Sequence, residues 1–451
     1  MNANTRTNYI CFVVALGGLL FGFDTAVISG VTDLVKGQFG LDTVSEGWLV
    51  SCGLLGSIAG VIATGAVSDR IGRRKTTLLA GVMFLLSAIG CGLAPSFHWL
   101  VAARIAGGIG VGMASVTSPM YITEFAPAAR RGRMVAYYQL AITLGILLAY
   151  LSNAALVHLA APGTNSLLNE PWRGMLIVMS IPALLFILLL ARVPESPRWL
   201  VTVNRPEEAL RVLRTVRLPA DAGKELDDIT KARNKAATQH TSLLHPSLRI
   251  PLLIGIVLAI LQQFSGINAI IYYGPEIFRS AGLNSNNALL FQAVIGTVNL
   301  LATLIAIAYA DKYGRKFLLK TGLSGMIIAL GGCGILFYTG HTQGWALLVL
   351  MLAYITCFAF SIGPVTWIII NEIFPTHVRV RAVTVCTLAL WGAVWLVGQF
   401  FPWLLEKAGA AFTFWAFALF SAINLVFSLT VVKETSGKTL EEMDTAFAAP
   451  H

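Results

Sequence analysis

The sequence predicts an all-α membrane protein with twelve membrane-spanning helices in two pseudo-symmetric six-helix halves. Only 12% of the 451 residues are charged and 56% are apolar, whereas a soluble domain carries about 25% charged residues. Apolar stretches of about 20 residues, long enough to cross a bilayer, recur along the chain. Charged motifs from the first half return in the second. This composition excludes a disordered chain, a coiled coil and almost any soluble enzyme.

The apolar stretches define the expected spans. They lie at 9–32, 47–68, 76–97, 98–121, 134–157, 174–192, 250–274, 286–310, 317–338, 345–371, 382–404 and 410–432. Glycine and proline occur inside them, which membrane helices tolerate because neighbouring groups satisfy the freed backbone. The first stretch is too long for the apolar part of a signal peptide and is predicted to be a span.

Basic residues predict the orientation of these spans. Lysine and arginine gather in alternate loops, which is typical of loops on the cytoplasmic side. These clusters lie at 70–75, 130–133, 312–316, 379–381 and 433–438. An even number of spans then places both termini in the cytoplasm. The net charge of +10 has this topological origin and does not indicate nucleic acid binding. The expected location is the plasma membrane, which in a bacterium is the inner membrane.

The spans divide the chain into four parts. The N-terminal half covers 1–192 and the C-terminal half 250–432, with a cytosolic tail at 433–451. Between the halves, residues 193–249 are rich in charge, and amphipathic helices are expected near 205–216 and 223–237. This segment is too short for an independent core. It is either a set of short cytosolic helices or a solvated linker with a few helical turns.

An internal repeat relates the two halves. Three charged motifs recur in the same order at a nearly constant separation. The matching segments are 69–75 with 311–316, 124–131 with 372–379, and, more loosely, 194–198 with 434–438. Parallel duplication of six spans is typical of secondary transporters that bind substrate at the repeat interface near the middle of the membrane.

Several motifs resemble the sugar porter family of the major facilitator superfamily over essentially the whole chain. Gly65-x-x-x-Asp69-Arg-x-Gly-Arg-Arg74 is similar to the general superfamily loop motif. More specific to sugar porters are Pro194-Glu-Ser-Pro-Arg198, Gln262-Gln-x-x-Gly266-Ile-Asn268 with Tyr272-Tyr273, and Gly363-Pro-x-x-Trp367. The resemblance implies the major facilitator fold and import of a hexose or pentose by proton symport through alternating access.

Asp24 and Arg104 are the two charged residues that lie away from the ends of the predicted spans, whereas Arg192 and Lys320 lie within four residues of a span end. A charge in hydrocarbon is costly and marks a functional site by default. Both are expected about 9–12 Å below the outer boundary at 1.5 Å of rise per residue. They are predicted to pair and to couple proton binding to transport, because the resemblance implies that an acid at this position in span one marks proton-coupled members. The alternative is a static structural ion pair.

A sugar needs hydrogen-bond partners and an apolar face. Uncharged amides donate and accept without the desolvation cost of an ion. The predicted substrate-binding residues are Gln139, Gln262, Gln263, Asn268 and Asn299, with Trp367 and Trp391 as stacking faces. The alternatives are hydrogen bonds between helices for the amides and membrane-interface positions for tryptophans. Aromatic gates are predicted at Phe21, Phe264, Tyr272 and Tyr273, although aromatics in membrane helices usually serve packing.

Acids and arginines at the predicted cytosolic ends of the spans form a candidate conformational latch. Carboxylate–guanidinium pairs there are expected to hold the two halves together and to break when the site opens inward. The cytosolic latch residues are Asp69, Arg74, Glu124, Arg131, Glu195, Arg198, Arg315, Glu372, Arg379 and Glu434. The positive-inside rule alone explains the arginines but not the repeated acids.

Other function classes fit the sequence less well. The seven histidines have no metal-ligand spacing within a span, and no phosphate-binding loop or catalytic triad stands out. No metal, cofactor or enzymatic activity is therefore expected, and the chain is expected to work as a monomer with a sugar, protons and lipid as its partners. The alternatives are a facilitative sugar uniporter and a non-transporting sugar sensor, against which the short tail argues.

Overall fold

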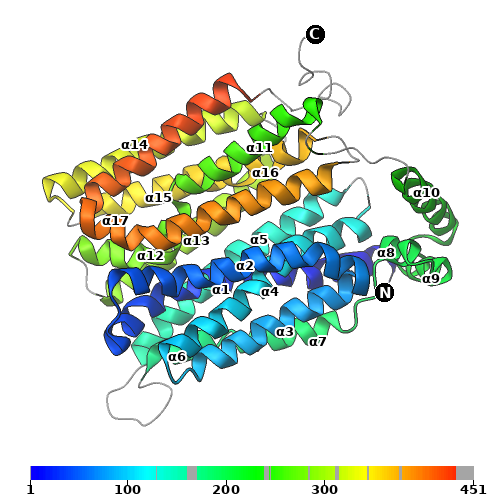
Figure 1. Cartoon of the computed structure of the whole chain (residues 1–451), viewed down its shortest axis with the longest axis horizontal. Coiled ribbons are helices and arrows are strands. Elements are labelled where there is room, and N and C mark those ends of the chain that lie inside the picture. Colours follow the sequence, from blue (N-terminus) through cyan, green and yellow to red (C-terminus); the bar gives the residue numbers. More distant parts are fainter. Residues whose placement is uncertain are drawn as a thin grey trace. The chain divides into compact units, whose positions relative to one another are not determined.

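The computed structural model describes residues 2–127, 130–159, 170–237, 243, 245–282, 285–309, 314–342, 345–374 and 378–432. The described residues form helices joined by short turns, and the long helices of each unit run side by side (Figure 1). The long helices of the first half are α1 (Ala3–Phe39), α2 (Thr43–Ile71), α3 (Arg73–Gly92), α4 (Phe97–Phe125) and α5 (Arg131–Leu159), followed by α6 (Pro171–Ile177) and α7 (Ser180–Leu190).

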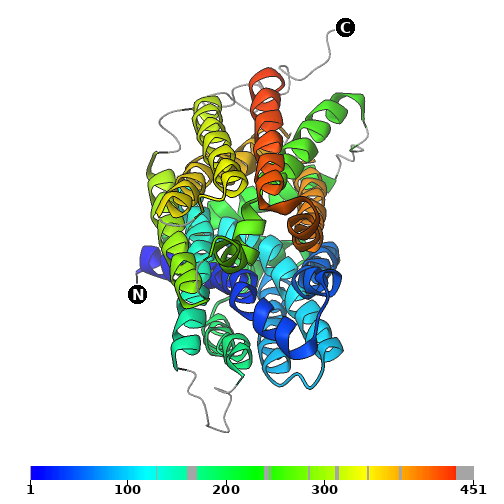
Figure 2. The same ribbon diagram turned by 90° about the vertical axis from the view of Figure 1, so that its left-hand side faces the viewer.

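The second half contains several broken or merged helices. Its elements are α11 (Pro246–Phe264), α12 (Ile267–Ser280), α13 (Ser285–Tyr309), α14 (Arg315–Thr339), α15 (Trp345–Phe360), α16 (Ile362–Glu372) and α17 (Arg379–Thr430). Figure 2 shows most of these helices nearly end-on. Gly266 has φ 93° between α11 and α12, and Gly409 has φ 81° within α17. Glycine adopts this backbone region without the steric cost that a side chain imposes.

Among the described residues, eleven helical segments are long and apolar enough to cross a membrane. The last of them, Arg381–Thr430, has 50 residues, about twice the length that one span requires. Its break at Gly409 divides it into the last two spans. The structure therefore confirms the all-α fold class and the twelve predicted spans. The chain is a multi-pass membrane protein.

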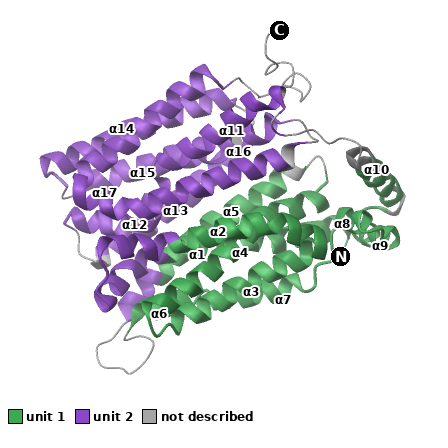
Figure 3. Cartoon of the chain, in the orientation of Figure 1, with its two compact units in different colours: residues 1–27, 52–152, 160–240 green, residues 28–51, 153–159, 241–451 purple. Residues whose placement is uncertain are grey.

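The chain forms two compact units, coloured separately in Figure 3. Unit 1 contains 1–27, 52–152 and 160–240, and unit 2 contains 28–51, 153–159 and 241–451. The units follow the two halves of the sequence except at 28–51 and 153–159. The end of α1 and the start of α2 therefore pack with the C-terminal helices.

Small residues bring the helices of unit 1 close together. A Cβ on Gly108 of α4 would lie 1.8 Å from the carbonyl oxygen of Gly53 on α2, and one on Gly112 would lie 2.1 Å from that of Ser57. Such close backbone approach through small residues is typical of helix packing in membranes. It also fixes the position of Arg104, since a Cβ on Gly53 would lie 3.4 Å from its Nη2.

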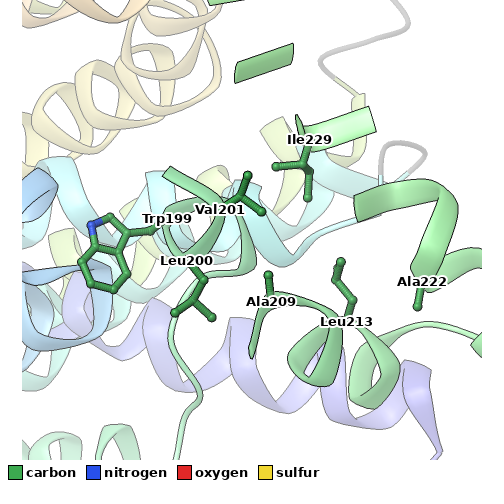
Figure 4. Packing of buried hydrophobic residues seen from close by; sticks show 7 residues of the cluster. All are labelled: Trp199, Leu200, Val201, Ala209, Leu213, Ala222 and Ile229. Carbon is green, nitrogen blue, oxygen red and sulfur yellow. The ribbon is translucent and has the colours of Figure 1, made fainter. Parts of the chain in front are cut away.

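The charged linker folds onto unit 1 as α8 (Pro197–Thr202), α9 (Pro206–Val216) and α10 (Pro219–Ala237). The last two correspond to the expected amphipathic helices, whereas α8 was not expected. Their apolar faces form a small cluster, drawn in Figure 4, of Trp199, Leu200, Val201, Ala209, Leu213, Ala222 and Ile229. Trp199 Nε1 donates to the carbonyl of Asp69 at 2.9 Å, and Arg217 donates to that of Phe125 at 2.9 Å. Residues 197–237 therefore form three short helices that pack with unit 1.

Candidate functional site

Asp24 and Arg104 are both buried in unit 1, with 9% and 5% of their surface exposed. Asp24 belongs to α1 and Arg104 to α4, and their side chains interact electrostatically. Arg104 also hydrogen-bonds with Cys52 on α2. The two side chains therefore lie close enough to interact electrostatically, and both their ion pair and its role in proton coupling stay predictions.

Gly107 of α4 has no side chain and so leaves room for the Asp24 carboxylate. A Cβ on Gly107 would lie 3.3 Å from Asp24 Oδ1 and 2.4 Å from Ser87 Oγ of α3. Gly107 follows Arg104 by three residues and therefore lies on the same face of α4, one turn on. The acid is held against the α4 backbone, next to its basic partner, in a space that a larger residue would fill.

Three of the predicted substrate amides form a hydrogen-bonded chain in unit 2, which we call the amide chain: Asn268, Gln263 and Gln262. Asn268 Nδ2 donates to Gln263 Oε1, and Gln263 Nε2 donates to Gln262 Oε1 at 3.3 Å. Gln262 Nε2 then donates to the carbonyl oxygens of Ile362 and Gly363 at 2.9 and 3.1 Å. The chain links two breaks in the helices, one between α11 and α12 and one between α15 and α16.

These two breaks are connected a second time by a tyrosine. Tyr354 Oη of α15 donates to the carbonyl of Ser265, at the end of α11, at 2.9 Å. Ser361, between α15 and α16, has φ −119° and ψ −96°, outside the helical range. Interrupted helices expose backbone carbonyls at mid-membrane, where transporters tolerate them because they line a binding site.

The other predicted binding residues have mixed surroundings. Asn299 on α13 is 8% exposed and Trp391 on α17 is 5% exposed, while Trp367 on α16 is partly buried. Gln139 belongs to unit 1 and is exposed on α5. The structure therefore brings Gln262, Gln263 and Asn268 into one group within unit 2, and a binding role for Gln139 stays a prediction.

The predicted gating aromatics are mostly packed within their units. Tyr272 and Tyr273 are 3% and 1% exposed. Tyr273 stacks on Phe401 at 5.0 Å between ring centroids, and its Oη donates to the carbonyl of Gly398 at 2.7 Å. Phe264 meets Phe420 edge to face at 5.1 Å. Phe21 is partly buried in unit 1. These contacts are the ones that packing requires, and a gating role stays a prediction.

The predicted latch of unit 1 has a different basic partner from the one expected. Arg73, rather than Arg74, contacts Glu124 (Nε to Oε1, 3.2 Å) and Asp69 (Nη1 to Oδ1, 3.1 Å). Arg74 instead donates to the carbonyl of Ala191. Successive residues on a helix point about 100° apart, so the sequence did not distinguish which arginine faces the acid.

Glu195 lies at the N-terminus of α3. Its Oε1 accepts from the backbone N–H groups of Arg73 at 2.9 Å and Arg74 at 3.1 Å. The first N–H groups of a helix have no partner within the helix and attract a negative charge. Arg198 lies in electrostatic range of Glu124. Glu195 thus ties the linker to the start of α3.

Gly72→Ala should destabilise this junction. Gly72 has φ 93° and ψ 167°, a region nearly restricted to glycine, and a Cβ there would lie 2.3 Å from Glu195 Oε2. We expect a loss of about 1–3 kcal/mol, measured as a lower thermal unfolding temperature in detergent. Gly65→Ala is the matched control, because a Cβ there meets nothing within 4 Å. Equal unfolding temperatures for the two variants would contradict this role of Gly72.

In unit 2 the corresponding pair joins α14 and α16. Arg315 Nη2 contacts Glu372 Oε1 at 3.1 Å, with 12% and 30% of the side chains exposed. The side chains of Arg131 and Arg379, and the whole of Glu434, lie outside the described residues. Every latch contact found therefore lies within one unit.

One group of charged residues was not predicted from the sequence. It lies at the ends of the helices opposite the predicted latch and consists of Lys36, Glu46 and Glu276. Lys36 Nζ pairs with Glu46 Oε2 at 2.6 Å, and the Glu46 side chain is 0% exposed. Glu276 of α12 lies close to both residues. Glu46 and Glu276 lie just outside the predicted spans that start at 47 and end at 274, so they are not among the charges inside spans. The signal in the sequence that could have identified these two residues is an acid directly at the end of an apolar run.

Two compact helical units, a buried acid–base pair and a buried amide chain at broken helices define a membrane transporter. The family described as "Sugar (and other) transporter" matches residues 10–447. The chain belongs to this family, and it is a transporter rather than an enzyme.

Individual relatives match over nearly their whole length. The chain is 40% identical to the arabinose-proton symporter of Bacillus subtilis over 448 residues, covering 98% of this chain and 96% of the relative. It is 38% identical to the D-xylose-proton symporter of Escherichia coli, covering 98% and 97%. A partially occluded inward-open structure of the xylose transporter XylE from E. coli matches with a TM-score of 0.86 and 35% identity, covering 97% and 100%.

Proposed function

We propose that the protein is a secondary active transporter that imports a monosaccharide together with a proton by alternating access. The amide chain carries this proposal, since it places three uncharged side chains next to backbone carbonyls at two helix breaks. Such groups donate to and accept from sugar hydroxyls without the desolvation cost of a charge. The names of relatives, which include arabinose-, D-xylose- and galactose-proton symporters, support a pentose or hexose substrate.

In this proposal Asp24 and Arg104 couple the proton to the sugar. A proton on Asp24 removes its charge and weakens its attraction to Arg104, so that the arginine and α4 are free to rearrange. If the two arrangements favour opposite openings of the sugar site, proton binding and sugar binding stabilise each other. The pair contacts Gly53 and Gly107 on close-packed helices, where a small shift is passed on to neighbouring segments.

Facilitative uniport is the second candidate. The resemblance includes animal facilitative carriers, and the amide chain suits a uniporter equally well. The buried acid favours symport, because a carrier that moves sugar alone needs no titratable group in its core.

Uptake of radiolabelled sugars by membrane vesicles tests the proposal. L-Arabinose, D-xylose, D-galactose and D-glucose are each offered with and without an inward proton gradient. We expect the gradient to drive accumulation of at least one of them, and an uncoupler to abolish it. Uptake that only equilibrates under both conditions would support the uniporter. No uptake of any sugar would contradict the substrate class.

We also propose that both termini face the cytoplasm and that the acid–arginine pairs Arg73–Glu124 and Arg315–Glu372 hold the cytosolic helix ends together, each pair within its own unit. The positive-inside distribution of Lys and Arg supports the orientation. Fluorescent and phosphatase fusions to the C-terminus test it, since the first is active in the cytoplasm and the second outside.

Charge reversal at Glu372 should weaken the latch. Glu372→Lys replaces the 3.1 Å contact with Arg315 by repulsion, so the ends of α14 and α16 should part more often. The reporter is Asn371→Cys, an exposed position on α16, labelled by a thiol reagent from the cytosolic side. We expect several-fold faster labelling than in the parent. Glu208→Lys, which breaks an exposed pair with Arg205 in the linker, is the matched control. Equal labelling rates in both variants would mean that Glu372 serves topology alone.

A further inference from the structure

Two carboxyl groups meet in unit 2, at the end expected to face outside. Glu46 lies in the first turn of α2, and its side chain is 0% exposed. Glu276 lies in α12, and the two side chains are within hydrogen-bonding reach of each other. The start of α2 is pressed against α17, because a Cβ on Gly47 would lie 2.2 Å from the carbonyl oxygen of Gln399. This packing contributes to the burial of the Glu46 side chain.

Each carboxyl group has one oxygen that lacks a donor. Among the described residues, nothing donates to Glu46 Oε1 or Glu276 Oε2, and both atoms are buried. The other oxygen of Glu46 accepts from Lys36 Nζ at 2.6 Å. Ionised carboxylates only accept hydrogen bonds, whereas a protonated one donates. A single proton on either residue therefore provides the donor that both oxygens lack.

The surrounding charges also favour one proton. Glu46, Glu276 and Lys36 together carry a net charge of −1 when both acids are ionised and are neutral with one proton. The other nearby charges pair with each other: Asp33 with Arg279, and Glu406 with Lys407. The α13 helix, which packs on α12, has no charged residue. An excess buried charge is costly, and one proton removes it.

We propose that Glu46 and Glu276 form a second proton-binding site, which holds the start of α2 against α12 while the proton is bound. Loss of the proton places two carboxylates in contact, and their repulsion separates the helices. The inference rests on the proposed transport function for its role in outward opening, but the site itself does not depend on the Asp24 mechanism.

The backbone of α12 allows such a movement. Gly266, with φ 93°, separates it from α11, and Tyr273 within it has a non-helical φ of −116° with ψ 15°. Hinges are residues at helix ends that absorb a change in φ and ψ. The segment between these positions and Ser280 contains Glu276 and Arg279, which make the contacts to α1 and α2. A charge change at Glu276 therefore acts on the part of α12 beyond its kink.

Infrared spectroscopy of the purified protein tests the shared proton directly, without sugar or transport. The experiment uses Asp24→Asn, so that Asp24 is silent, and compares spectra with and without Glu276→Gln, so that any contribution of the largely buried Glu124 cancels. We expect a carboxylic-acid C=O band near neutral pH that disappears as the pH rises. Adding Glu276→Gln should remove the band, because Glu46 is then ionised beside Lys36. No titrating band in Asp24→Asn, or a band unchanged by Glu276→Gln, would overturn the proposal.

Labelling from outside tests the consequence. Ser51, which is 0% exposed and donates to Gln399 Oε1 at 2.5 Å, is replaced by cysteine in a chain freed of its six native cysteines. The labelling rate is the rate with an impermeant thiol reagent divided by that of free cysteine at the same pH, because only the thiolate reacts and its share rises with pH. With Asp24→Asn, this labelling rate should rise with external pH, by up to about tenfold per unit for a one-proton equilibrium. Glu276→Gln, which donates permanently, should make labelling slow and independent of pH.

Asp42→Asn is the matched control, an exposed acid at the same end of α2. Hydrogen bonds from the side chain and backbone N–H of Ser45 lower the pKa of Asp42, so it stays ionised across the pH range tested. Its replacement should leave the labelling profile unchanged. A pH dependence that persists in Glu276→Gln, or labelling that follows sodium concentration at fixed pH, would overturn the proposal. If the infrared and labelling results are as expected but the protein transports no sugar, the proposed function is contradicted and the proton-binding site is not.

Discussion

Asp24→Asn is expected to abolish accumulation of the sugar against a gradient while sugar binding and exchange persist. The amide has nearly the shape of the acid but carries no charge, so it imitates the protonated state permanently. Arg104 is then without its anionic partner at every pH. The transporter can still alternate with sugar bound, but it can no longer take up a proton outside and release it inside.

The burial of the pair makes this effect large. Asp24 and Arg104 are 9% and 5% exposed, and a full charge in hydrocarbon is costly without its partner. Neutralising one member therefore changes the energetic balance between conformations by more than a surface substitution does. Counterflow in vesicles measures exchange, and uptake under a proton gradient measures accumulation.

Asp42→Asn is again the control, and it should accumulate sugar like the parent. If Asp24→Asn also accumulates sugar, the proton is carried elsewhere. If it loses counterflow as well, Asp24 is needed for the fold or for sugar binding, and the coupling role is wrong.

Gln262→Ala is expected to weaken sugar binding strongly. Removing the amide leaves the carbonyls of Ile362 and Gly363 without their donor and Gln263 without its acceptor. In addition, a sugar hydroxyl loses a partner. One unsatisfied buried group costs about 1–3 kcal/mol, which corresponds to roughly five- to 150-fold in affinity. Equilibrium binding of the preferred sugar to purified protein measures the loss.

Gln292→Ala is the matched control for this substitution. Gln292 is equally buried and donates to the carbonyls of Ile270 and Ile271 at 3.0 and 3.3 Å, but it is outside the amide chain. We expect it to lower the unfolding temperature while sugar affinity changes little. Near-parental binding by Gln262→Ala would remove this residue from the site, and equal losses in both variants would show a structural effect only.

The spans were predictable because the bilayer itself fixes their length and apolarity. Every predicted span corresponds to a helix or to a pair of consecutive helices, and Gly409 divides the last long helix where the sequence placed a loop. The breaks within spans were not predicted in detail. Gly266 is one of 42 glycines, and only its tertiary surroundings give it a positive φ.

The candidate site was predictable to a different extent. The sequence identified Asp24 and Arg104 because a charge inside an apolar run has no other common explanation. Gln262, Gln263 and Asn268 came from a motif and are joined in the structure. The sequence did not distinguish Arg73 from Arg74, since that depends on how α3 is rotated about its axis. Glu46 was not among the predicted site residues, because it lies just outside the predicted span and the start of α2 is covered by α17, far away in the sequence.

Sugar-induced proton uptake tests the central claim of proton-coupled import most directly. Vesicles in weakly buffered medium, without a membrane potential, are mixed with the sugar that the uptake panel identifies, and the external pH is followed. Symport predicts a rise in external pH when sugar is added to the parent, and none with Asp24→Asn. Sugar entry into parent vesicles without any pH change would contradict symport, and the Asp24–Arg104 pair would then be a structural ion pair in a uniporter.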